Sequence, residues 1–339
     1  MKRITIVGAG LAGLALGNAL QRAGIATTIH EAGGLPRHRV CGEFLCGRGA
    51  EALNQLGLRC VLTDAIQHRQ IHWYLHGRRI LRSTLPAPAY GISRHRLDDQ
   101  LAQHFRAQGG RLIEHSRAPQ SNVTEGTVLC CGRQATTSDW IGLKLHCTQL
   151  QTHVDLELHL GKNAYLGLST VEDGRVNACA LLKRRPELKA SREDRLPSYL
   201  DACGLSAVAK RIRAGGIDPK SHAGVAGIVF SQEPMVHDNT LRLGDAYSVI
   251  PPFTGNGMSI ALESAEIALP ELLSYARGKQ PWSTAVATIR KSCDVRFRPR
   301  LRAAQRLHPW ISRPARQRTL ATLCRLQLLP FRLLYKLTH

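Results

Sequence analysis

The first thirty residues alternate between short apolar runs and glycine-containing turns. Residues 4–7 form a β-branched run, residues 11–23 have the apolar periodicity of a helix, and residues 26–31 form a second run. The order strand, glycine-rich turn, helix and strand is typical of a nucleotide-binding βαβ unit. A secretory signal would account only for the basic start and the apolar run, so we favour the βαβ unit.

Predicted strands dominate the middle of the chain, and predicted helices dominate its end. Strands are expected over residues 71–81 (with a turn at His76-Gly77), 127–131, 142–147, 154–160, 164–169, 177–182, 225–231 and 240–243. Helices are expected over residues 51–57, 94–108, 186–214, 257–277, 283–306 and 315–337, the last with a break at Pro330. Residues 85–89 carry two prolines and are expected to be a connection. No apolar stretch reaches about 18 residues, so no helix is expected to span a bilayer.

Composition and charge narrow the class of protein. The chain has 339 residues, 43% of them hydrophobic and 21% charged, which is typical of globular proteins with a buried core. The formal net charge is +21, and residues 295–339 contain eleven Lys or Arg and no Asp or Glu. Such a surface suits nucleic acid or acidic lipid, and equally suits a solvated positive face. The ten cysteines include no Cys-x-x-Cys pair, so we expect reduced cysteines and no metal site.

A glycine motif follows the first predicted strand and reads Gly8-Ala9-Gly10-Leu11-Ala12-Gly13. We expect its first glycine to allow a tight turn, its second to let the backbone approach a pyrophosphate, and its third to let helix and strand pack closely. The helix N-terminus then offers free N–H groups to phosphate. Glu31, at the end of the second strand, is expected to bind ribose hydroxyls. The motif suits FAD and NAD equally.

A second motif lies late in the chain. A Gly-Asp pair, Gly244-Asp245, follows a predicted strand, and the sequence before the next helix reads Pro251-Pro252-Phe253-Thr254-Gly255-Asn256-Gly257-Met258. With these motifs the chain resembles the FAD-dependent oxidoreductases of the p-hydroxybenzoate hydroxylase and geranylgeranyl reductase superfamily. The resemblance implies that Asp245 binds the ribityl hydroxyls of FAD. It also implies that the backbone of Gly255, Asn256, Gly257 and Met258 faces the flavin ring, where a helix N-terminus stabilises the anionic reduced flavin.

Two segments between these motifs fit the same superfamily. Residues 36–45 resemble the Cys-Gly-Glu-Phe-Leu segment of bacterial flavoproteins encoded beside polyketide synthases, which implies that Arg39, Gly42 and Glu43 lie near the flavin. Residues 94–98 resemble the Arg-x-x-Leu-Asp motif of the superfamily, which implies that Arg94 approaches FAD. An ordinary surface position or ion pair is the alternative for Arg94.

Pattern and resemblance together predict an α/β fold. An FAD-binding, Rossmann-like βαβ domain is interleaved with a β-rich substrate domain, and C-terminal helices follow. We assign residues 1–68, 90–135 and 237–280 to the discontinuous FAD-binding domain. Residues 69–89 and 136–236 form the β-rich substrate domain, and residues 281–339 form a basic C-terminal helical segment.

The resemblance implies an NAD(P)H-dependent monooxygenase that hydroxylates an aromatic or polyketide-like small molecule. NAD(P)H would act as a transient reductant, because the chain has no second glycine fingerprint. The alternative is flavin-dependent reduction of a C=C bond in a lipid, prenyl or polyketide substrate. Residues 165–170 keep the Tyr of the geranylgeranyl reductase motif and lack its Trp, Phe and Pro, which disfavours prenyl reduction. Lys144, His146 and His159 are expected in the substrate wall without a specific signal, so no catalytic base is assigned.

The basic C-terminal segment allows a third, non-catalytic interpretation as a binder of membrane surfaces or nucleic acid. Leucines recur at three- or four-residue steps at positions 320, 323, 326, 329, 333 and 337. This amphipathic pattern suits an anionic membrane, and it suits a helix packed on the body of the protein, which we favour. Aromatic residues make up only 5%, and no nucleic-acid motif is present, so nucleic acid is disfavoured. We expect a cytoplasmic protein, or one at the periphery of the inner face of the membrane.

Overall fold

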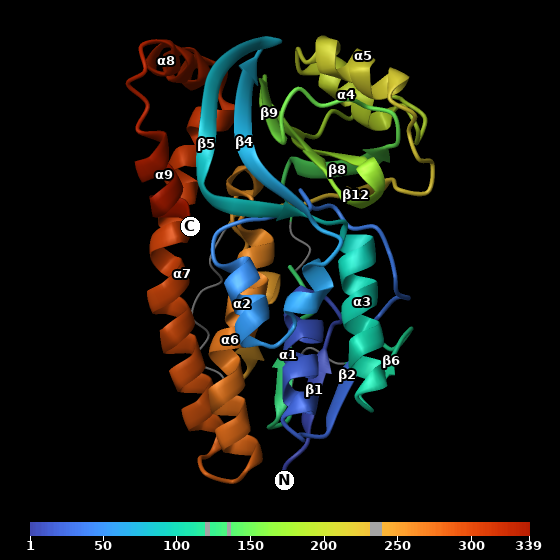
Figure 1. The fold of residues 1–339 in the computed structure, drawn as a ribbon, viewed down its shortest axis with the longest axis vertical. Helices are drawn as coiled ribbons and strands as arrows, with labels where there is room; N and C mark the ends of the chain where they lie inside the picture. The colour runs from blue at the N-terminus through green and yellow to red at the C-terminus, as the bar shows by residue number, and fades with distance from the viewer. Residues whose placement is uncertain (119–122, 134–136, 231–238) are drawn as a thin grey trace.

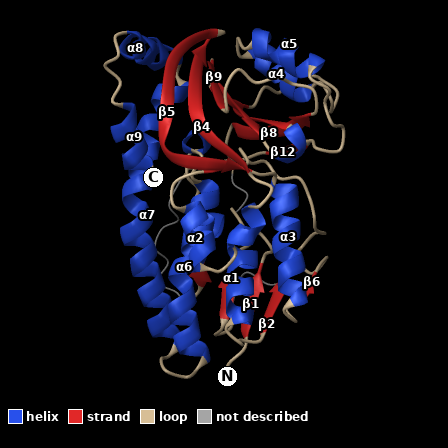
Figure 2. Ribbon diagram, in the orientation of Figure 1, coloured by secondary structure: helices blue, strands red, loops and turns tan. Residues whose placement is uncertain are grey.

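Two β-sheets and a set of long helices build the molecule (Figures 1 and 2). The computed structural model describes residues 1–118, 123–133, 137–230 and 239–339. Sheet A lies near the N-terminus in the lower half of Figure 1, and sheet B lies in the upper half. The mixed α/β fold predicted from the sequence is confirmed, including the helices that follow the sheets.

Sheet A is a five-stranded parallel sheet in the order β13-β7-β1-β2-β6. Its strands are β1 (Ile4–Val7), β2 (Thr27–His30), β6 (Arg111–Ile113), β7 (Thr127–Leu129) and β13 (Leu241–Arg242). Because the strands are parallel, their carboxyl ends lie at one edge of the sheet. The loops that follow these strands therefore meet at that edge, which is where open α/β sheets bind ligands.

Helices α1 (Leu11–Arg22), α2 (Gly49–Gln55), α3 (Arg94–Ala107) and α6 (Gly257–Ala276) accompany sheet A. Helix α1 packs against α3, α6 and strands β1 and β2, and its first ten residues are buried. The packing is close enough that a Cβ at Gly17 would stand 2.7 Å from the Ile29 side chain. This contact fixes α1, and hence the loop before it, against the sheet.

Sheet B has eight strands in the order β12-β8-β11-β10-β9-β4-β5-β3. Their bounds are β3 (Phe44–Leu45), β4 (Ile66–Leu75), β5 (Arg78–Gly91), β8 (Trp140–Cys147), β9 (Leu156–Gly161), β10 (Ala164–Thr170), β11 (Val176–Lys183) and β12 (Ala223–Val225). Neighbours are antiparallel except β4 and β9. Side chains alternate between two faces, as in β10, where Leu166 and Leu168 pack in the cluster under α4 (Arg195–Ala202) and α5 (Ser206–Ala214). Tyr165 and Gly167 face the opposite side, where they line a cavity.

Three C-terminal helices complete the fold: α7 (Trp282–Ser312), α8 (Pro314–Arg325) and α9 (Phe331–Thr338). Helix α7 packs along α6 and then reaches sheet B, while α8 and α9 pack on β5 (Figure 1). Leu320, Ala321 and Cys324 of α8 are buried in the cluster above β5. Short 3-10 helices occupy η1 (Arg59–Leu62), η2 (Glu172–Gly174), η3 (Gly244–Ala246) and η4 (Pro252–Thr254). Within the described residues, no helix combines the length and the apolarity that crossing a membrane requires.

Several predicted boundaries are wrong, and left-handed glycines explain two of them. The helix predicted over residues 186–214 is instead α4 and α5, separated at Gly204 (φ +77°). The strand predicted over residues 225–231 ends at Val225, before Gly227 (φ +65°), and residue 231 lies outside the described part. The break expected at Pro330 spans residues 326–330, and α7 continues to Ser312 rather than ending at 306.

The connection predicted over residues 85–89 is wrong, because these residues belong to β5. Pro86 and Pro88 stand where the register between β5 and β4 shifts, so their missing N–H groups interrupt no regular ladder. Strand β3 and the ends of β4 and β5 belong to sheet B, although they fall in ranges assigned to the FAD-binding domain. The domain assignment stays a prediction, and its boundaries at 135–136 and 236–237 lie outside the described residues.

A buried carboxylate, Glu157, ties α5 to sheet B. Arg211 of α5 donates to both its oxygens at 2.8 and 3.1 Å, and His159 Nε2 lies 2.7 Å away. Burial would raise the pKa of Glu157, but the hydrogen bonds from His159 and Arg211 outweigh it and lower the pKa to about 2. Because this value is below the ordinary 4.5, the carboxylate stabilises the fold fully above pH 4.5. That contribution is lost as the pH falls through 2.

We therefore predict that Glu157→Gln lowers the free energy of unfolding at pH 7 by on the order of 3 kcal/mol. The gap between wild type and variant should shrink as the pH falls from 4.5 towards 2, measured by urea unfolding. Glu187→Gln, at an exposed position, is the matched control and should change stability little. A gap that stays constant over this pH range would contradict the assignment.

Candidate active site

One large cavity, of about 1400 Å³, lies between the carboxyl edge of sheet A and a face of sheet B. The loops after β1, β2, β7 and β13 reach it, as do strands β4, β9, β10 and β11. Pockets for a single small molecule measure about 300–1000 Å³, so this cavity has room for a second ligand. Of the fifteen residues predicted for the cofactor site, the following thirteen line it: Gly8, Gly10, Leu11, Ala12, Glu31, Arg39, Gly42, Glu43, Arg94, Asp245, Gly255, Gly257 and Met258.

The glycine loop has the backbone geometry expected from its sequence. Gly8 has φ +106°, and a Cβ there would lie 2.4 Å from the Cys130 carbonyl oxygen. Gly13 does not line the cavity; its Cβ would lie 2.1 Å from the Gly8 carbonyl oxygen, so it serves close packing. A Cβ at Gly10 would have no neighbour closer than 3.9 Å. The N-terminus of α1 has no side-chain cap and no acidic residue in its first turn, so its free N–H groups suit an anion.

Glu31 is a buried carboxylate directly beside this loop. Its Oε2 accepts a hydrogen bond from Ala9 N at 2.8 Å. Its Oε1 accepts from Gly33 N at 3.1 Å and from Arg37 at 2.7 Å. A carboxylate has about four lone-pair positions, so capacity remains for hydroxyl groups in the cavity.

Two arginines share one buried aspartate next to the loop. Arg94 donates twice to Asp98, at 2.9 Å each, and Arg39 donates to Asp98 Oδ2 at 3.1 Å. Burial and the neighbouring Arg94 lower the pKa of Arg39, so positive charge is in excess here. An anion in the cavity would relieve that excess. Arg94 lines the cavity and also forms an ion pair, so the place near the cofactor and the ion pair considered from the sequence do not exclude each other.

Glu43 lies at the junction of the two sheets, and its carboxylate is fully buried. Lys144 Nζ lies 2.9 Å from Oε1 and His146 Nε2 lies 2.6 Å from Oε2. Arg94 N donates to Oε1 at 2.9 Å. Both carboxylate oxygens of Glu43 are occupied by these partners. The side chain therefore connects sheet B to the start of α3, and it does not offer free oxygens to a ligand in the cavity.

The charges around Glu43 set its ionisation. Burial would raise the pKa of Glu43, but the His146 hydrogen bond and the Lys144 charge outweigh it and lower the pKa to about 2. Burial and the Lys144 charge lower the pKa of His38 to about 4, so His38 is neutral at pH 7. Ligand atoms of His38, Glu43 and His146 lie within 4.8 Å of one another, the spacing of a metal site. Lys144 Nζ, 3.1 Å from His38 Nδ1, already supplies the positive charge among them.

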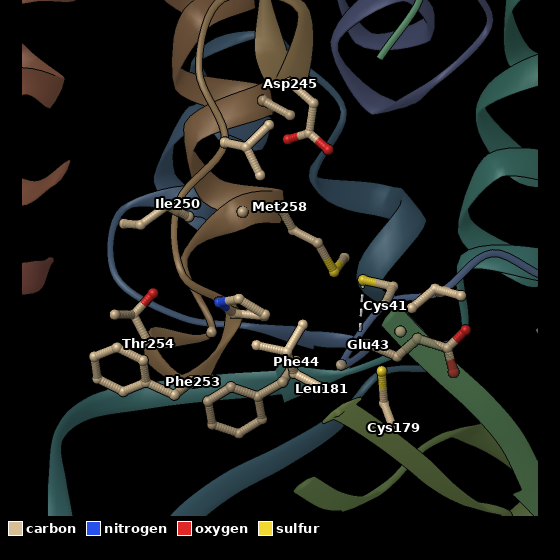
Figure 3. Close-up of a pocket in the computed structure, with 18 of the residues that line it drawn as sticks. Cys41, Glu43, Phe44, Cys179, Leu181, Asp245, Ile250, Phe253, Thr254 and Met258 are labelled. Atoms are coloured by element: carbon tan, nitrogen blue, oxygen red, sulfur yellow. Dashed lines mark hydrogen bonds between the residues drawn. The ribbon is translucent and has the colours of Figure 1, made fainter. Parts of the chain in front are cut away.

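Asp245 and the turn before α6 form the far wall of the cavity (Figure 3). Among the described residues, none forms a hydrogen bond with the Asp245 side chain. Burial raises the pKa of this carboxyl, and Arg94, Arg133 and Arg39 oppose the rise. Gly255 has φ +72°, and a Cβ at Gly257 would meet no atom within 4 Å. An unpartnered carboxylate and an uncrowded helix N-terminus fit a ligand that carries hydroxyl groups and a flat polar ring.

Asn256 is fully buried and does not line the cavity. Its Nδ2 donates to the Thr338 carbonyl oxygen at the end of α9. Cys46 Sγ, which contacts the Gly255 carbonyl oxygen, lies 3.1 Å from His339 Nε2. The segment that includes α9 is therefore attached to the turn predicted to face the flavin.

The rest of the cavity is apolar and aromatic. It is lined from sheet B and from the turn before α6 by Phe44, Ile71, Trp73, Leu158, Tyr165, Leu181 and Phe253 (Figure 3 shows part of this wall). The C-terminal helices and their linkers add Leu307, Trp310, Ile311, Leu320, Leu323, Leu329, Phe331, Leu334 and Tyr335. Sequence analysis left these C-terminal positions without a role in the site.

Comparison with known proteins identifies the class. A family model described as "FAD binding domain" matches residues 1–128, which include the glycine loop, Glu31 and Arg94. The chain is an FAD-dependent oxidoreductase. The residues of the cavity fit FAD, since the loop suits a pyrophosphate and the Asp245 side chain, within the described part of the chain, has no hydrogen-bond partner. The individual contacts to FAD stay predictions.

Curated and solved relatives resemble this oxidoreductase over most of its length. The menaquinone reductases of Mycobacterium tuberculosis and Mycolicibacterium smegmatis are 25% and 22% identical, over 84% of this chain and 79% of theirs. Pseudomonas aeruginosa PqsL in complex with 2-aminobenzoylacetate has a TM-score of 0.74 at 15% identity, over 95% of this chain and 98% of that one. Klebsiella pneumoniae HpxO complexed with FAD and uric acid has a TM-score of 0.77 at 15% identity, over 99% and 96%. The solved structures share the fold of this oxidoreductase.

Sequence analysis missed the partners of Glu43 in the oxidoreductase. Lys144 and His146 were placed in the substrate wall, whereas both side chains point to Glu43. The available signal was their spacing: they are two residues apart on a strand whose other residues are almost all apolar, so they share one face. Two polar side chains on one face of a buried strand require a buried partner.

We predict that Lys144→Met destabilises the oxidoreductase by about 3–5 kcal/mol, because it leaves the buried Glu43 carboxylate without its cation. Adding Glu43→Gln to this variant should recover part of the loss, since the uncompensated charge is removed. Both would be measured by urea unfolding, with Lys162→Met at an exposed turn as the control. If the double variant were less stable than Lys144→Met, the ion-pair argument would fail.

Proposed function

We propose that this oxidoreductase is an NAD(P)H-dependent monooxygenase that hydroxylates an aromatic small molecule. The observation that carries the proposal is the cavity itself. It joins an anion-binding glycine loop to an aromatic chamber through the turn at Gly255–Met258. A cofactor that spans the first part would present its reactive end to a substrate in the second.

In this proposal, each residue in the part of the cavity beside the glycine loop has its own role in binding FAD. The N-terminus of α1 binds the pyrophosphate, Glu31 binds the ribose hydroxyls, and Asp245 binds the ribityl hydroxyls. Arg39 adds positive charge beside the pyrophosphate, and the N-terminus of α6 faces the flavin ring. When bound, FAD supplies hydride acceptance and the activation of oxygen. The protein binds, orients and excludes water.

NAD(P)H is proposed as a transient reductant. The sequence contains one glycine fingerprint, and the FAD family model covers it. A reductant that docks briefly needs no dedicated βαβ unit of its own. The choice between NADH and NADPH is left to the assay below.

The chamber suits an aromatic, weakly polar substrate. Phe44, Trp73 and Phe253 offer ring faces and edges, which favour stacking with a planar molecule. Burial raises the pKa of Tyr165 well above its ordinary value, and its hydroxyl accepts a hydrogen bond from Phe253 N. Tyr165 therefore stays protonated and orients the wall rather than acting as a base. The solved relatives PqsL and HpxO are in complex with small molecules, 2-aminobenzoylacetate and uric acid respectively.

A second candidate function is reduction of a C=C bond in a quinone lipid or a similar substrate. The match to menaquinone reductases over 84% of the chain favours it, as does the long apolar wall from α8 and α9. The same flavin site serves both reactions. They differ in their need for oxygen.

The experiment that separates the two candidates has two steps. The visible spectrum of purified protein should show flavin bands at about one equivalent of FAD per chain. NADPH and NADH oxidation is then followed with phenols, alkylresorcinols and quinones, with and without oxygen. Substrate-dependent turnover that stops under argon supports the monooxygenase, and turnover that continues supports the reductase. Folded protein that stays colourless and takes up no added FAD would overturn both.

We predict that Asp245→Ala weakens FAD binding about 10- to 100-fold, because each hydrogen bond to a charged group contributes about 1.5–3 kcal/mol. Binding is measured as quenching of flavin fluorescence on titration of the apoprotein. The apoprotein itself should be about as stable as wild type, since no described residue forms a hydrogen bond with the Asp245 side chain that the change would remove. Asp99→Ala, at a half-buried position of α3 that does not line the cavity, is the control and should leave FAD binding unchanged. Equal FAD affinity in both variants would refute this role for Asp245.

A further inference from the structure

Helix α9 has one apolar face that is covered by protein and an opposite, exposed face on which leucines lie among basic residues. Phe331, Leu334, Tyr335 and Thr338 point inward and line the cavity. Leu333 and Leu337 lie on the opposite face, beside Arg332 and Lys336, and all four are exposed. The outer face is therefore a mixed surface on which two exposed leucines lie beside two basic residues.

The linker between α8 and α9 continues this exposed surface. Leu326 and Leu328 are 62% and 63% exposed, and Leu333 and Leu337 are 55% and 49% exposed. These four leucines lie within twelve residues, whereas the remaining exposed large apolar residues of the described chain, Met1, Ile66 and Val295, are scattered. We refer to Leu326, Leu328, Leu333 and Leu337 as the leucine patch. Clustered exposed leucines mark an interaction site, whereas single ones do not.

The charge around the leucine patch has one sign. Arg325, Arg332 and Lys336 are exposed among the leucines. The sequence has no Asp or Glu from residue 295 to residue 339. Among the described residues, no acidic group pairs with these three side chains. A surface that mixes leucines with unpaired cations is suited to the boundary between the phosphate head groups and the acyl chains of a lipid bilayer.

We propose that the leucine patch and its three cations bind an anionic lipid surface. The leucines enter the hydrocarbon boundary, and Arg325, Arg332 and Lys336 bind phosphate groups of the lipid head region. A second copy of the chain fits less well, because two such patches would bring six positive charges together without a counter-charge.

The position of the leucine patch bears on the substrate, and this step rests on the proposed function. The inner face of α9 and residues Leu323, Leu329 and Pro330 line the apolar part of the cavity, directly behind the patch. Docking through the outer face therefore sets the apolar wall of the cavity beside the lipid. The substrate class that this arrangement fits is an aromatic or quinone head with an alkyl or prenyl chain, dissolved in the lipid.

The first test is co-sedimentation of the FAD-loaded protein with two kinds of vesicle. One is made of phosphatidylcholine alone, and the other also contains about 30% phosphatidylglycerol, which gives it a negative surface potential. We expect binding to the anionic vesicles and little to the neutral ones. Arg325→Gln/Arg332→Gln/Lys336→Gln should weaken binding about fivefold per residue, roughly a hundredfold in all. Leu326→Ser/Leu328→Ser/Leu333→Ser/Leu337→Ser should weaken it at least as much.

The matched control removes three exposed cations elsewhere. Arg277, Lys279 and Lys291 lie at and near the turn between α6 and α7, at the opposite end of the molecule from α8 in Figure 1. Their replacement by Gln should change binding less than threefold. Equal losses in the two triple variants would mean a diffuse effect of net charge and would overturn the proposal. So would wild-type protein that fails to bind anionic vesicles, or a dimer in sedimentation velocity that the Leu→Ser variant abolishes.

A second test addresses the substrate and separates its failure from that of the proposed function. NAD(P)H oxidation is compared for a long-chain quinone or alkylphenol in anionic vesicles and for its short, water-soluble analogue. The Leu→Ser variant should lose at least tenfold on the vesicle-borne substrate and keep wild-type turnover of the soluble one, since none of the four leucines lines the cavity. If the variant matched wild-type turnover on the vesicle-borne substrate as well as on the soluble one, the proposal of a lipid-dissolved substrate would be overturned. Vesicle binding without turnover of any substrate would leave the docking surface in place and refute the proposed function instead.

Discussion

Burial of the Glu43 carboxylate is the constraint on which the junction of the two sheets depends. An ionised carboxylate inside a protein is stable only if cations and hydrogen-bond donors surround it. Lys144 and His146 come from sheet B, and the Arg94 N–H comes from the start of α3 beside sheet A. Ser169 also donates to the Gly42 carbonyl oxygen, and Asn177 donates to the Cys41 carbonyl oxygen, so sheet B holds three successive residues of this loop. The polar half of the cavity is thereby fixed to the sheet that forms its apolar half.

Charge pairing extends from this point to the glycine loop. Arg94 binds Asp98, Asp98 binds Arg39, and Arg39 lies 3.8 Å from Glu31, which accepts from Ala9 N. Each buried acid in this series has a cationic or N–H partner, so none is left at a high energetic cost. Asp245 differs from Glu31 and Glu43, the other carboxylates that line the cavity: its side chain is open to the cavity and has no hydrogen-bond partner among the described residues. A ligand bound in the cavity could reach it, and its role in binding FAD stays a prediction.

The sequence was most informative where structure is set by neighbours along the chain. Gly8 and Gly13 were predicted correctly because a tight turn and a close helix contact are local requirements that only glycine meets. The partners of Glu43 are more than a hundred residues away, and nothing in a single sequence specifies such pairs. The side chain of Asn256 was not foreseen for the same reason: it holds α9 from 82 residues away, while the prediction that its backbone faces the flavin stays a prediction. Amphipathic spacing showed that the C-terminal helices have an apolar face, but it could not show that this face forms a cavity wall.

The two halves of the cavity are held by different kinds of interaction, which bears on specificity. Directional hydrogen bonds and charges fix the cofactor half, so small displacements there are costly. Apolar contacts form the other half, and such walls distinguish ligands that differ by one methylene only weakly. Helix α9 has eight residues, too few to be stable alone, so it depends on Asn256 at the turn and on packing against β5. The α9 part of the cavity wall and the turn predicted to face the flavin are therefore held together, and the same contacts position the leucines on the outer face of α9.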